Sequence, residues 1–296
     1  MRRIPTHDDM SFSAADLIAL LDLEPIEHNI YRGQNRDIGT GMIYGGQVLA
    51  QALVAAARTV PEYRPIHSMH GYFILAGDLS VPVVYFVDRL RDGGSFATRR
   101  VTAIQHGEAI FNLSASFHRR EEGLRHQVEM PDAPDPESLT PELDVIRARR
   151  DEIPESLRDT LTQDRPLDIR PVDDPDPFVV AERPPRRCFW VRASGALDDD
   201  PVHHQAVLAY ASDYGLLVTS LRPHGMTFRD PRLMVASLDH SIWFHRPFRA
   251  DEWLLYQVES PVAASGLGFA RGTYFSRDGD VVASVAQEGL IRVRTR

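Results

Sequence analysis

The sequence predicts an α+β fold in which an antiparallel sheet wraps around a central helix, and it predicts this unit twice in one chain. Two observations lead to this prediction. One helix-forming segment followed by four strand-like segments occurs within residues 1–120 and again within 186–296. Matching residues in the two regions are also separated by an almost constant offset, which is typical of an internal duplication.

The first copy contains the more regular pattern. A strand around 28–32 precedes a helix over 45–60, in which apolar residues recur at helical spacing. Four runs rich in Val, Phe, Tyr and Ile follow, at about 65–75, 81–91, 95–105 and 109–119. Turns that contain glycine separate several of them, which favours hairpins. An apolar helix followed by hairpin-linked strands predicts a sheet that buries the helix.

The second copy repeats this order of elements. A strand over 187–194 precedes a helix at about 202–217, and further strands are expected near 233–245, 253–260, 267–276 and 281–293. A sheet wrapped around one central helix is the hot-dog fold. The sequence therefore predicts a tandem, or double, hot-dog.

The duplication is visible in residues that recur 173 positions further along the chain. The pairs are His67-Ser68 with His240-Ser241, Asp78 with Asp251, and Phe96-Ala97 with Phe269-Ala270. Single short matches arise by chance, but a constant offset across several strands indicates a diverged repeat.

Residues 121–185 differ in composition from both copies. They hold 11 of the 21 prolines and 18 of the 42 acidic residues, with short helical or irregular pieces such as 144–150. Such a composition predicts a linker or a surface wrap rather than a core. We expect an N-terminal hot-dog over 1–120, a linker over 121–185 and a C-terminal hot-dog over 186–296.

Composition excludes several classes of function. A net charge of −9 and a pI of about 5.7 argue against a nucleic-acid partner. All 33 basic residues are arginine, which excludes a catalytic Schiff-base lysine and a P-loop lysine. No apolar run approaches the roughly 18 residues needed to cross a bilayer, so no membrane partner is expected.

The expected compartment is the cytoplasm. Cys188 is the single cysteine, so no intramolecular disulfide can form, which fits a reducing environment. The N-terminal segment lacks an apolar signal-like region, and the last residues do not form a peroxisomal signal.

Common catalytic motifs are missing from the sequence. Without a Gly-x-Ser-x-Gly segment, an α/β-hydrolase is not expected. Histidine pairs occur, but no carboxylate or cysteine completes a recognisable ligand pattern. Neither a metal site nor a cofactor is expected.

Asp213 is the first candidate for chemistry. Apolar residues three and four positions away on both sides place its carboxylate on an apolar stripe of the expected helix. A buried carboxylate must be hydrogen-bonded or protonated, because burial of an unpaired charge is costly. The alternative is an acid at a helix end that caps a neighbouring loop, and the sequence leaves both open.

Gln287 and Ser237 are the second and third candidates. Gln287 ends an apolar row on the last strand, where it could tie backbone groups together or hold a water or a substrate carbonyl. Ser237 lies in a run that is apolar on both faces, where a serine is more often a satisfied core hydroxyl than a catalytic group. In the repeat, Ala115 corresponds to Gln287 at an offset of 172. Ala55 corresponds to Asp213 if Gln47 and Gln205 are taken as equivalent positions in the two helices. Alanine at both positions of the first copy indicates one polar site for the two copies.

The sequence resembles the acyl-CoA thioesterase II family of double hot-dog proteins over nearly its whole length. The segments that carry the resemblance are Tyr31-Arg32-Gly33-Gln34, Gly45-Gly46-Gln47-Val48, Arg91-Asp92-Gly93, Ala211-Ser212-Asp213, Asp239-His240-Ser241, Trp243-Phe244-His245-Arg246-Pro247-Phe248 and Gln287-Glu288-Gly289. Blocks of this length in this order are specific.

The resemblance implies an acyl-CoA substrate and a catalytic trio of Asp213, Ser237 and Gln287. Bacterial members often have threonine where this chain has Ser237; the hydroxyl is kept and the methyl group that restricts its rotamer is lost. The implied reaction is direct hydrolysis, with Asp213 as general base for a water and no covalent acyl-enzyme.

Coenzyme A carries phosphates, and the arginines nearest to a family-like loop are Arg91, Arg99 and Arg100. Arg99 and Arg100 point to opposite faces of one strand, so only one of them is expected to meet the ligand. Solvated arginines, or arginines paired with carboxylates, are the alternative.

Two other functions are compatible with the fold. An enoyl-CoA hydratase would need a Gly-Asp-x-Asn-Pro-x-His-type segment, which is missing from the sequence. A non-catalytic acyl-CoA-binding protein would keep the fold with an inert site, since fold alone does not establish function. Because hot-dog sheets commonly associate, a homodimer or homotetramer is expected.

Overall fold

A computed structural model of the chain describes residues 11–62, 64–173, 176–228 and 230–294. The first ten residues, on which part of the expected location rests, lie outside this description. In the described part, no helix has the length and apolar character needed to cross a bilayer.

Helices and strands follow the predicted order in both copies. The helices are α1 (Ala14–Leu21), α2 (Gly45–Ala57), α3 (Glu142–Ala148), α4 (Glu155–Thr162), α5 (Pro201–Ser212) and α6 (Leu216–Leu221), with 3-10 turns η1 (Pro136–Ser138), η2 (Arg150–Glu152) and η3 (Arg222–His224). The strands are β1 (Glu24–Glu27), β2 (Ile30–Gly33), β3 (Ile66–Phe73), β4 (Val83–Asp92), β5 (Phe96–Gln105), β6 (Glu108–His118), β7 (Leu167–Pro171), β8 (Arg186–Ala193), β9 (Leu233–Ser237), β10 (Asp239–Phe244), β11 (Leu254–Ala264), β12 (Leu267–Ser276) and β13 (Val281–Val293).

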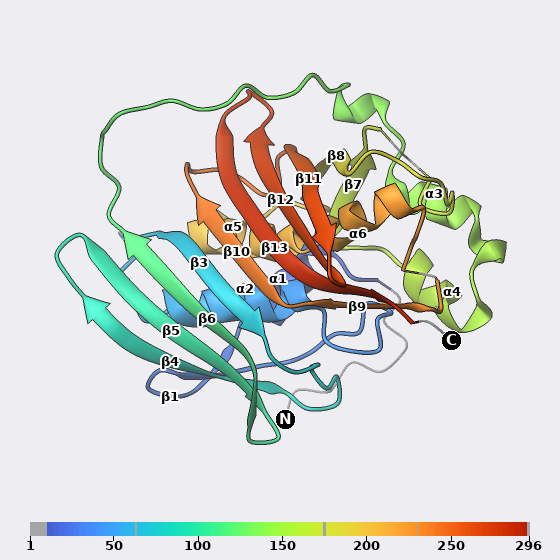
Figure 1. The fold of residues 1–296 in the computed structure, drawn as a ribbon. Coiled ribbons are helices and arrows are strands. Elements are labelled where there is room, and N and C mark those ends of the chain that lie inside the picture. The colour runs from blue at the N-terminus through green and yellow to red at the C-terminus, as the bar shows by residue number, and fades with distance from the viewer. Residues whose placement is uncertain (1–10, 63, 174–175, 229, 295–296) are drawn as a thin grey trace.

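These strands form one continuous antiparallel sheet (Figure 1). Its order is β1-β2-β4-β5-β6-β3-β10-β13-β12-β11-β8-β7, with β9 paired to β13. The order is symmetric about the central β3–β10 pair, because β6, β5 and β4 on one side correspond to β13, β12 and β11 on the other. At this centre Met69 pairs with Ile242, its counterpart 173 residues later. An approximate two-fold axis thus relates the two copies.

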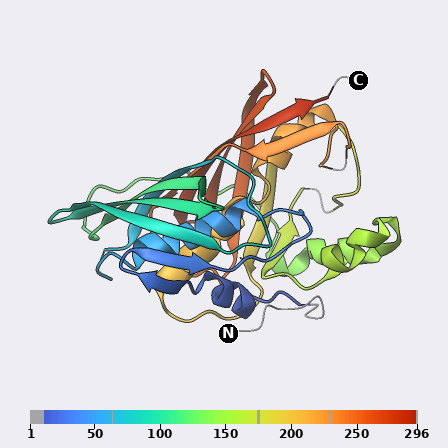
Figure 2. The same cartoon turned by 90° about the horizontal axis from the view of Figure 1, so that it is seen from below.

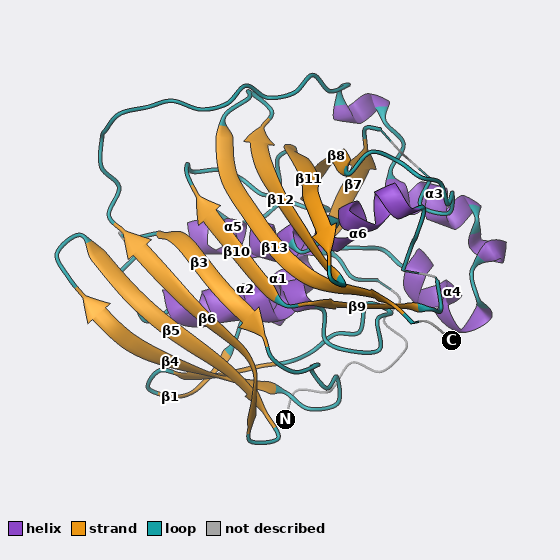
Figure 3. Cartoon of the chain, viewed as in Figure 1, coloured by secondary structure: helices purple, strands orange, loops and turns teal. Residues whose placement is uncertain are grey.

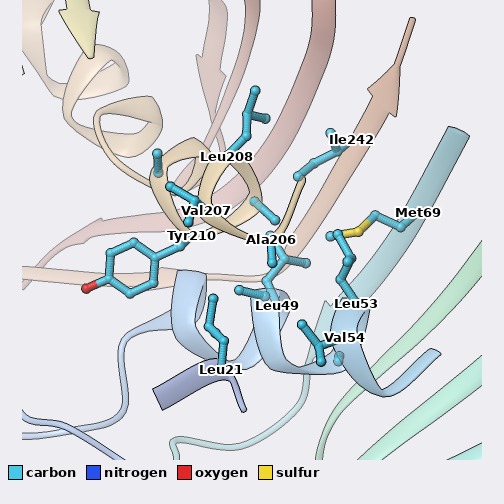
Figure 4. Close-up of a cluster of buried hydrophobic side chains, with 14 of the residues drawn as sticks. Leu21, Leu49, Leu53, Val54, Met69, Ala206, Val207, Leu208, Tyr210 and Ile242 are labelled. Atoms are coloured by element: carbon cyan, nitrogen blue, oxygen red, sulfur yellow. The ribbon is translucent and has the colours of Figure 1, made fainter. Parts of the chain in front are cut away.

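The two long helices α2 and α5 lie side by side against one face of this sheet (Figures 2 and 3). They run antiparallel, since the start of α2 contacts the end of α5 through the hydrogen bond from Gly46 N–H to Asp213. Apolar side chains of both helices fill the space between them and the central strands (Figure 4). Eleven of the thirteen α2 residues are buried, so this helix is a core element on all sides.

The second helix differs from the prediction over 202–217. It ends at Ser212 with Asp213 as its C-cap, and α6 begins separately at Leu216. The break comes from Gly215, whose φ of 89° lies in the left-handed region that favours glycine. The strand predicted over 233–245 is likewise two strands, β9 and β10, which meet at Leu238.

Residues 121–185 contain α3, α4 and β7 in addition to irregular chain. β7 pairs with β8 and so extends the sheet of the second copy. The irregular part is anchored by tryptophan side chains, since Trp190 Nε1 donates to the carbonyl of Pro134 at 2.9 Å and Trp253 Nε1 to Glu137 at 3.0 Å. The division of the chain into two hot-dogs and a linker at these limits stays a prediction.

Candidate active site

The carboxylate of Asp213 lies where the end of α5 meets the start of α2. Its side chain is 6% exposed. The N–H of Gly46, in the first turn of α2, donates to Oδ2 at 3.0 Å. A Cβ atom on Gly45 would lie only 2.7 Å from the same oxygen, so the missing side chain allows the helix to approach. The helix N-terminus also presents its positive dipole end to the carboxylate.

Gln287 reaches the same carboxylate from the middle of β13. Its Nε2 donates to Asp213 Oδ1 at 2.6 Å, and the side chain is 1% exposed. Among the described residues its Oε1 atom has no hydrogen-bond partner. A buried amide oxygen without a partner is unusual, and it is available to a water or a ligand.

Ser237 completes the group from β9. This strand pairs with β13 two residues beyond Gln287, where Ser237 faces Gly289. The side chain of Ser237 lies near enough to the Asp213 carboxylate to lower its pKa. The structure therefore brings together the three residues singled out in the sequence, each from a different element. Asp213 occupies the helix-end position that the sequence left as an alternative, but it binds α2 rather than capping a loop.

Burial determines the electrostatics of this group. Burial raises the pKa of Asp213 above its ordinary value, and hydrogen bonds from Gln287 and Gly46, together with the nearby Ser237 side chain, oppose this rise. Carboxyl groups with a raised pKa are stronger bases than exposed carboxylates, and they concentrate at catalytic sites.

Comparison with known proteins gives matches along nearly the whole chain. A family described as "Acyl-CoA thioesterase N-terminal domain" matches residues 34–118, and one described as "Acyl-CoA thioesterase" matches 156–290. Acyl-CoA thioesterase 2 of Haemophilus influenzae is 41% identical over 283 residues, which cover 96% of this chain and 99% of the relative. Acyl-coenzyme A thioesterase 8 of Mus musculus is 42% identical over 285 residues, covering 93% of this chain and 88% of the relative.

The chain belongs to the acyl-CoA thioesterase II family. The fold agrees with this assignment. The crystal structure of an acyl-CoA thioesterase II from Mycobacterium marinum superposes with a TM-score of 0.76 at 42% identity, covering 94% of this chain and 99% of that one. The predicted family and the predicted α+β double hot-dog are thus both confirmed.

The arginines predicted to meet CoA phosphates in this thioesterase lie far from the trio. Arg99 contacts Thr59, just past the C-terminal end of α2, whereas Asp213 contacts Gly46 at the other end. At about 1.5 Å per residue, the thirteen residues of α2 separate the two ends by roughly 20 Å.

Arg99 does not fit the predicted role, because its guanidinium is fully buried and fully used. It is 0% exposed, and its five N–H groups donate to Thr59, Asp92 and the carbonyls of Arg91 and Thr98. Arg100 points to the opposite face, as predicted, and pairs with Asp88 at 2.8 Å. Arg91 is exposed at the end of β4.

The segment 121–185 of the thioesterase also approaches the trio. Glu142, the first residue of α3, is buried and accepts a hydrogen bond from the hydroxyl of Tyr214, the residue after Asp213. Arg165 and Arg187 lie 3.5 and 3.8 Å from the same carboxylate. A cleft of about 630 Å³ opens beside Glu142, but the trio does not line it. Sequence reasoning missed this contact, because nothing in the acidic composition of the segment distinguishes Glu142.

Proposed function

We propose that this chain hydrolyses acyl-CoA by direct attack of a water molecule on the thioester carbonyl, with Asp213 as the general base. The observation that carries the proposal is the buried carboxylate of Asp213, whose pKa is raised, next to Gln287 Oε1, which has no hydrogen-bond partner among the described residues. Membership of the family supports an acyl-CoA substrate.

Each group has a defined part in this reaction. The water oxygen forms a bond to the carbonyl carbon while one water proton passes to Asp213. Gln287 Oε1 accepts a hydrogen bond from the other water proton, and the Ser237 hydroxyl orients the water. The C–S bond then breaks, and the thiolate of CoA takes the proton from Asp213, which returns the carboxylate. The oxyanion is stabilised by the N-terminus of α2, whose dipole favours negative charge.

Binding of the CoA moiety is assigned to the exposed arginines. Arg91 and Arg100 are accessible to a phosphate, in contrast to Arg99, and Arg91 is the stronger candidate because Arg100 already pairs with Asp88. We also keep the homodimer or homotetramer and the cytoplasmic location as proposals. Light scattering of the purified chain tests the first, and cell fractionation followed by activity tests the second.

The decisive experiment measures thiol release from a series of short- to long-chain acyl-CoAs. We expect wild-type protein to hydrolyse them and Asp213→Asn to lose about 10²–10⁴-fold in kcat, the usual contribution of a positioned base. Asp159→Asn is the matched control, because it makes the same chemical change on an exposed carboxylate outside both proposed sites. Circular dichroism verifies that both variants are folded.

Two outcomes would contradict the proposal. Full activity in Asp213→Asn would mean that another group is the base, and an acyl adduct on Ser237 in intact-mass spectrometry would replace direct hydrolysis by a covalent route. Acyl-CoA binding without turnover by the wild type would instead identify a non-catalytic binding protein.

A further inference from the structure

His240 is a buried histidine beside the trio that the proposed reaction does not use. It lies on β10, next to Gln287 on β13, and is 0% exposed. Its Nε2 is 2.8 Å from the hydroxyl of Ser212, and its Nδ1 is 3.9 Å from Asp213 Oδ1. Nδ1 has no hydrogen-bond partner in the part of the chain that the structure describes.

Ser212 determines which nitrogen of His240 carries the proton. At the end of α5, the hydroxyl of Ser212 lies 2.8 Å from the carbonyl oxygen of Ala209. A carbonyl oxygen can only accept, so the hydroxyl donates its proton to it. Because the only proton of the Ser212 hydroxyl is in this hydrogen bond, its oxygen can only accept a hydrogen bond from His240 Nε2. His240 therefore carries its proton on Nε2 and turns the lone pair of Nδ1 toward Asp213.

We infer that His240 is a positioning residue for hydrolysis, because its Nδ1 lone pair repels the Asp213 carboxylate and accepts a hydrogen bond from the protonated carboxyl. The inference rests on the proposed function and deepens it. When water transfers its proton to Asp213, the new O–H can donate to Nδ1 after a closure of about 1 Å to a normal hydrogen-bond distance. That bond exists only after proton transfer, so it favours the transition state over the ground state.

No proton is lost or gained by His240 in this scheme. The water proton moves to Asp213, the hydrogen bond to Nδ1 holds it there, and the departing thiolate removes it. Burial lowers the pKa of His240 to about 3, so the ring stays neutral throughout.

Three tyrosines also interact electrostatically with Asp213: Tyr44 at the start of α2, Tyr210 on α5 and Tyr256 on β11. Burial raises the pKa of all three hydroxyl groups, so they stay neutral as well.

The test is the pH dependence of kcat for His240→Gln and Ser212→Ala. Both changes remove the Nδ1 lone pair that faces Asp213. His240→Gln removes the ring itself, and Ser212→Ala allows the His240 ring to carry its proton on Nδ1 instead of Nε2. We expect the low-pH side of the kcat profile (the acid limb), which reports ionisation of Asp213, to move to lower pH, because the lone pair that repels the carboxylate is gone. The plateau kcat should fall roughly three- to tenfold, with KM changed less than twofold. Ser284→Ala is the matched control, because it deletes an equivalent serine–histidine hydrogen bond, to His245 at 2.8 Å, on the opposite face of β13 from Gln287. It should change neither limb nor plateau.

An acid limb that stays in place, or moves to higher pH, would overturn the inference. The second result would mean that Nδ1 carries the proton and stabilises the carboxylate. Nitrogen NMR of wild-type protein labelled in histidine reads the tautomer directly and decides the question if a variant does not fold. Failure of the wild type to release thiol would count against the proposed function alone, because the tautomer and the carboxyl titration of Asp213 remain measurable by NMR.

Discussion

The two ends of the antiparallel α2–α5 pair are related by the approximate two-fold axis, yet they use polar groups in opposite ways. One end buries Asp213 with Oε1 of Gln287 and Nδ1 of His240 left without partners among the described residues. The other end buries Arg99 with all five donors engaged. At the repeat positions of Asp213 and Gln287, this second end has Ala55 and Ala115, both fully or almost fully buried.

Reactive and structural polar groups in the core differ in whether all their hydrogen-bonding atoms have partners. A structural group is satisfied by its neighbours, since an unpaired buried polar atom costs about 1–3 kcal/mol. A group that must meet a water or a substrate keeps unpaired atoms in the protein alone. By this criterion Asp213, Gln287 and His240 form a group that is built for a reaction, whereas the guanidinium of Arg99 is a structural group.

Disruption of the Asp213 end should have the largest effect. In Gly46→Ala the new Cβ would lie 2.4 Å from the backbone oxygen of Tyr210, an atom that cannot move cheaply. We expect a loss of roughly 1–3 kcal/mol in the free energy of unfolding from overpacking, and about a 10²-fold fall in kcat from displacement of the helix start. Denaturant unfolding and thiol release measure the two effects.

Gly94→Ala provides the matched control at the Arg99 end, since a Cβ there has no atom within 4 Å. It should keep wild-type stability and activity. Wild-type kcat in Gly46→Ala would show that contact between the start of α2 and Asp213 does not matter for turnover.

Removal of the buried guanidinium should separate stability from catalysis. Arg99→Leu leaves the carbonyls of Thr59, Arg91 and Thr98 without their donor, so we expect a loss of about 2 kcal/mol in stability. KM for acyl-CoA should remain within twofold of wild type. In contrast, Arg91→Glu should raise KM severalfold with little change in stability. If KM for acyl-CoA rose in Arg99→Leu but not in Arg91→Glu, Arg99 rather than Arg91 would bind the CoA moiety.

Much of the fold could be predicted from local sequence. The strands 267–276 and 281–293 agree with β12 and β13, because turn residues such as Gly279 mark their limits clearly. The helix over 202–217 was extended too far, since Leu216 and Leu217 keep helical spacing across the break at Gly215. Periodicity detects a shared face, but it cannot detect a single left-handed residue.

The site could be predicted only in part. Sequence pattern singles out Asp213, Ser237 and Gln287 as candidates, and the resemblance implies their roles. The groups that surround them come from distant segments, such as Gly46 on α2 and His240 on β10. The burial of Arg99 was missed because strand alternation separates it from Arg100 without saying which of the two faces inward. Buried arginines are also rare, so an exposed position was the better expectation.

Burial of the Asp213 carboxylate should lower the stability of the folded chain, and this is the smallest of the expected effects. In Asp213→Asn, the amide oxygen can accept a hydrogen bond from the Gly46 N–H. The amide nitrogen can donate to Gln287 Oε1 after the Gln287 side-chain amide flips, so residue 213 keeps both hydrogen-bond partners. Because burial raises the folded-state pKa of Asp213, the folded chain binds more protons than the unfolded chain between the two pKa values. Stability of the wild type therefore falls as pH rises through that window, and the penalty is complete above it.

The trade of stability for catalysis at this end is best measured as the free energy of unfolding of Asp213→Asn relative to wild type, at pH 8 and at decreasing pH. We expect the inactive variant to be the more stable protein at pH 8, by about 1 kcal/mol, the usual size of a single stabilising change. We also expect this advantage to shrink as the pH falls toward 4. A variant that is less stable than wild type at pH 8, or an advantage that grows on acidification, would contradict the claim that this end gives up stability for catalysis.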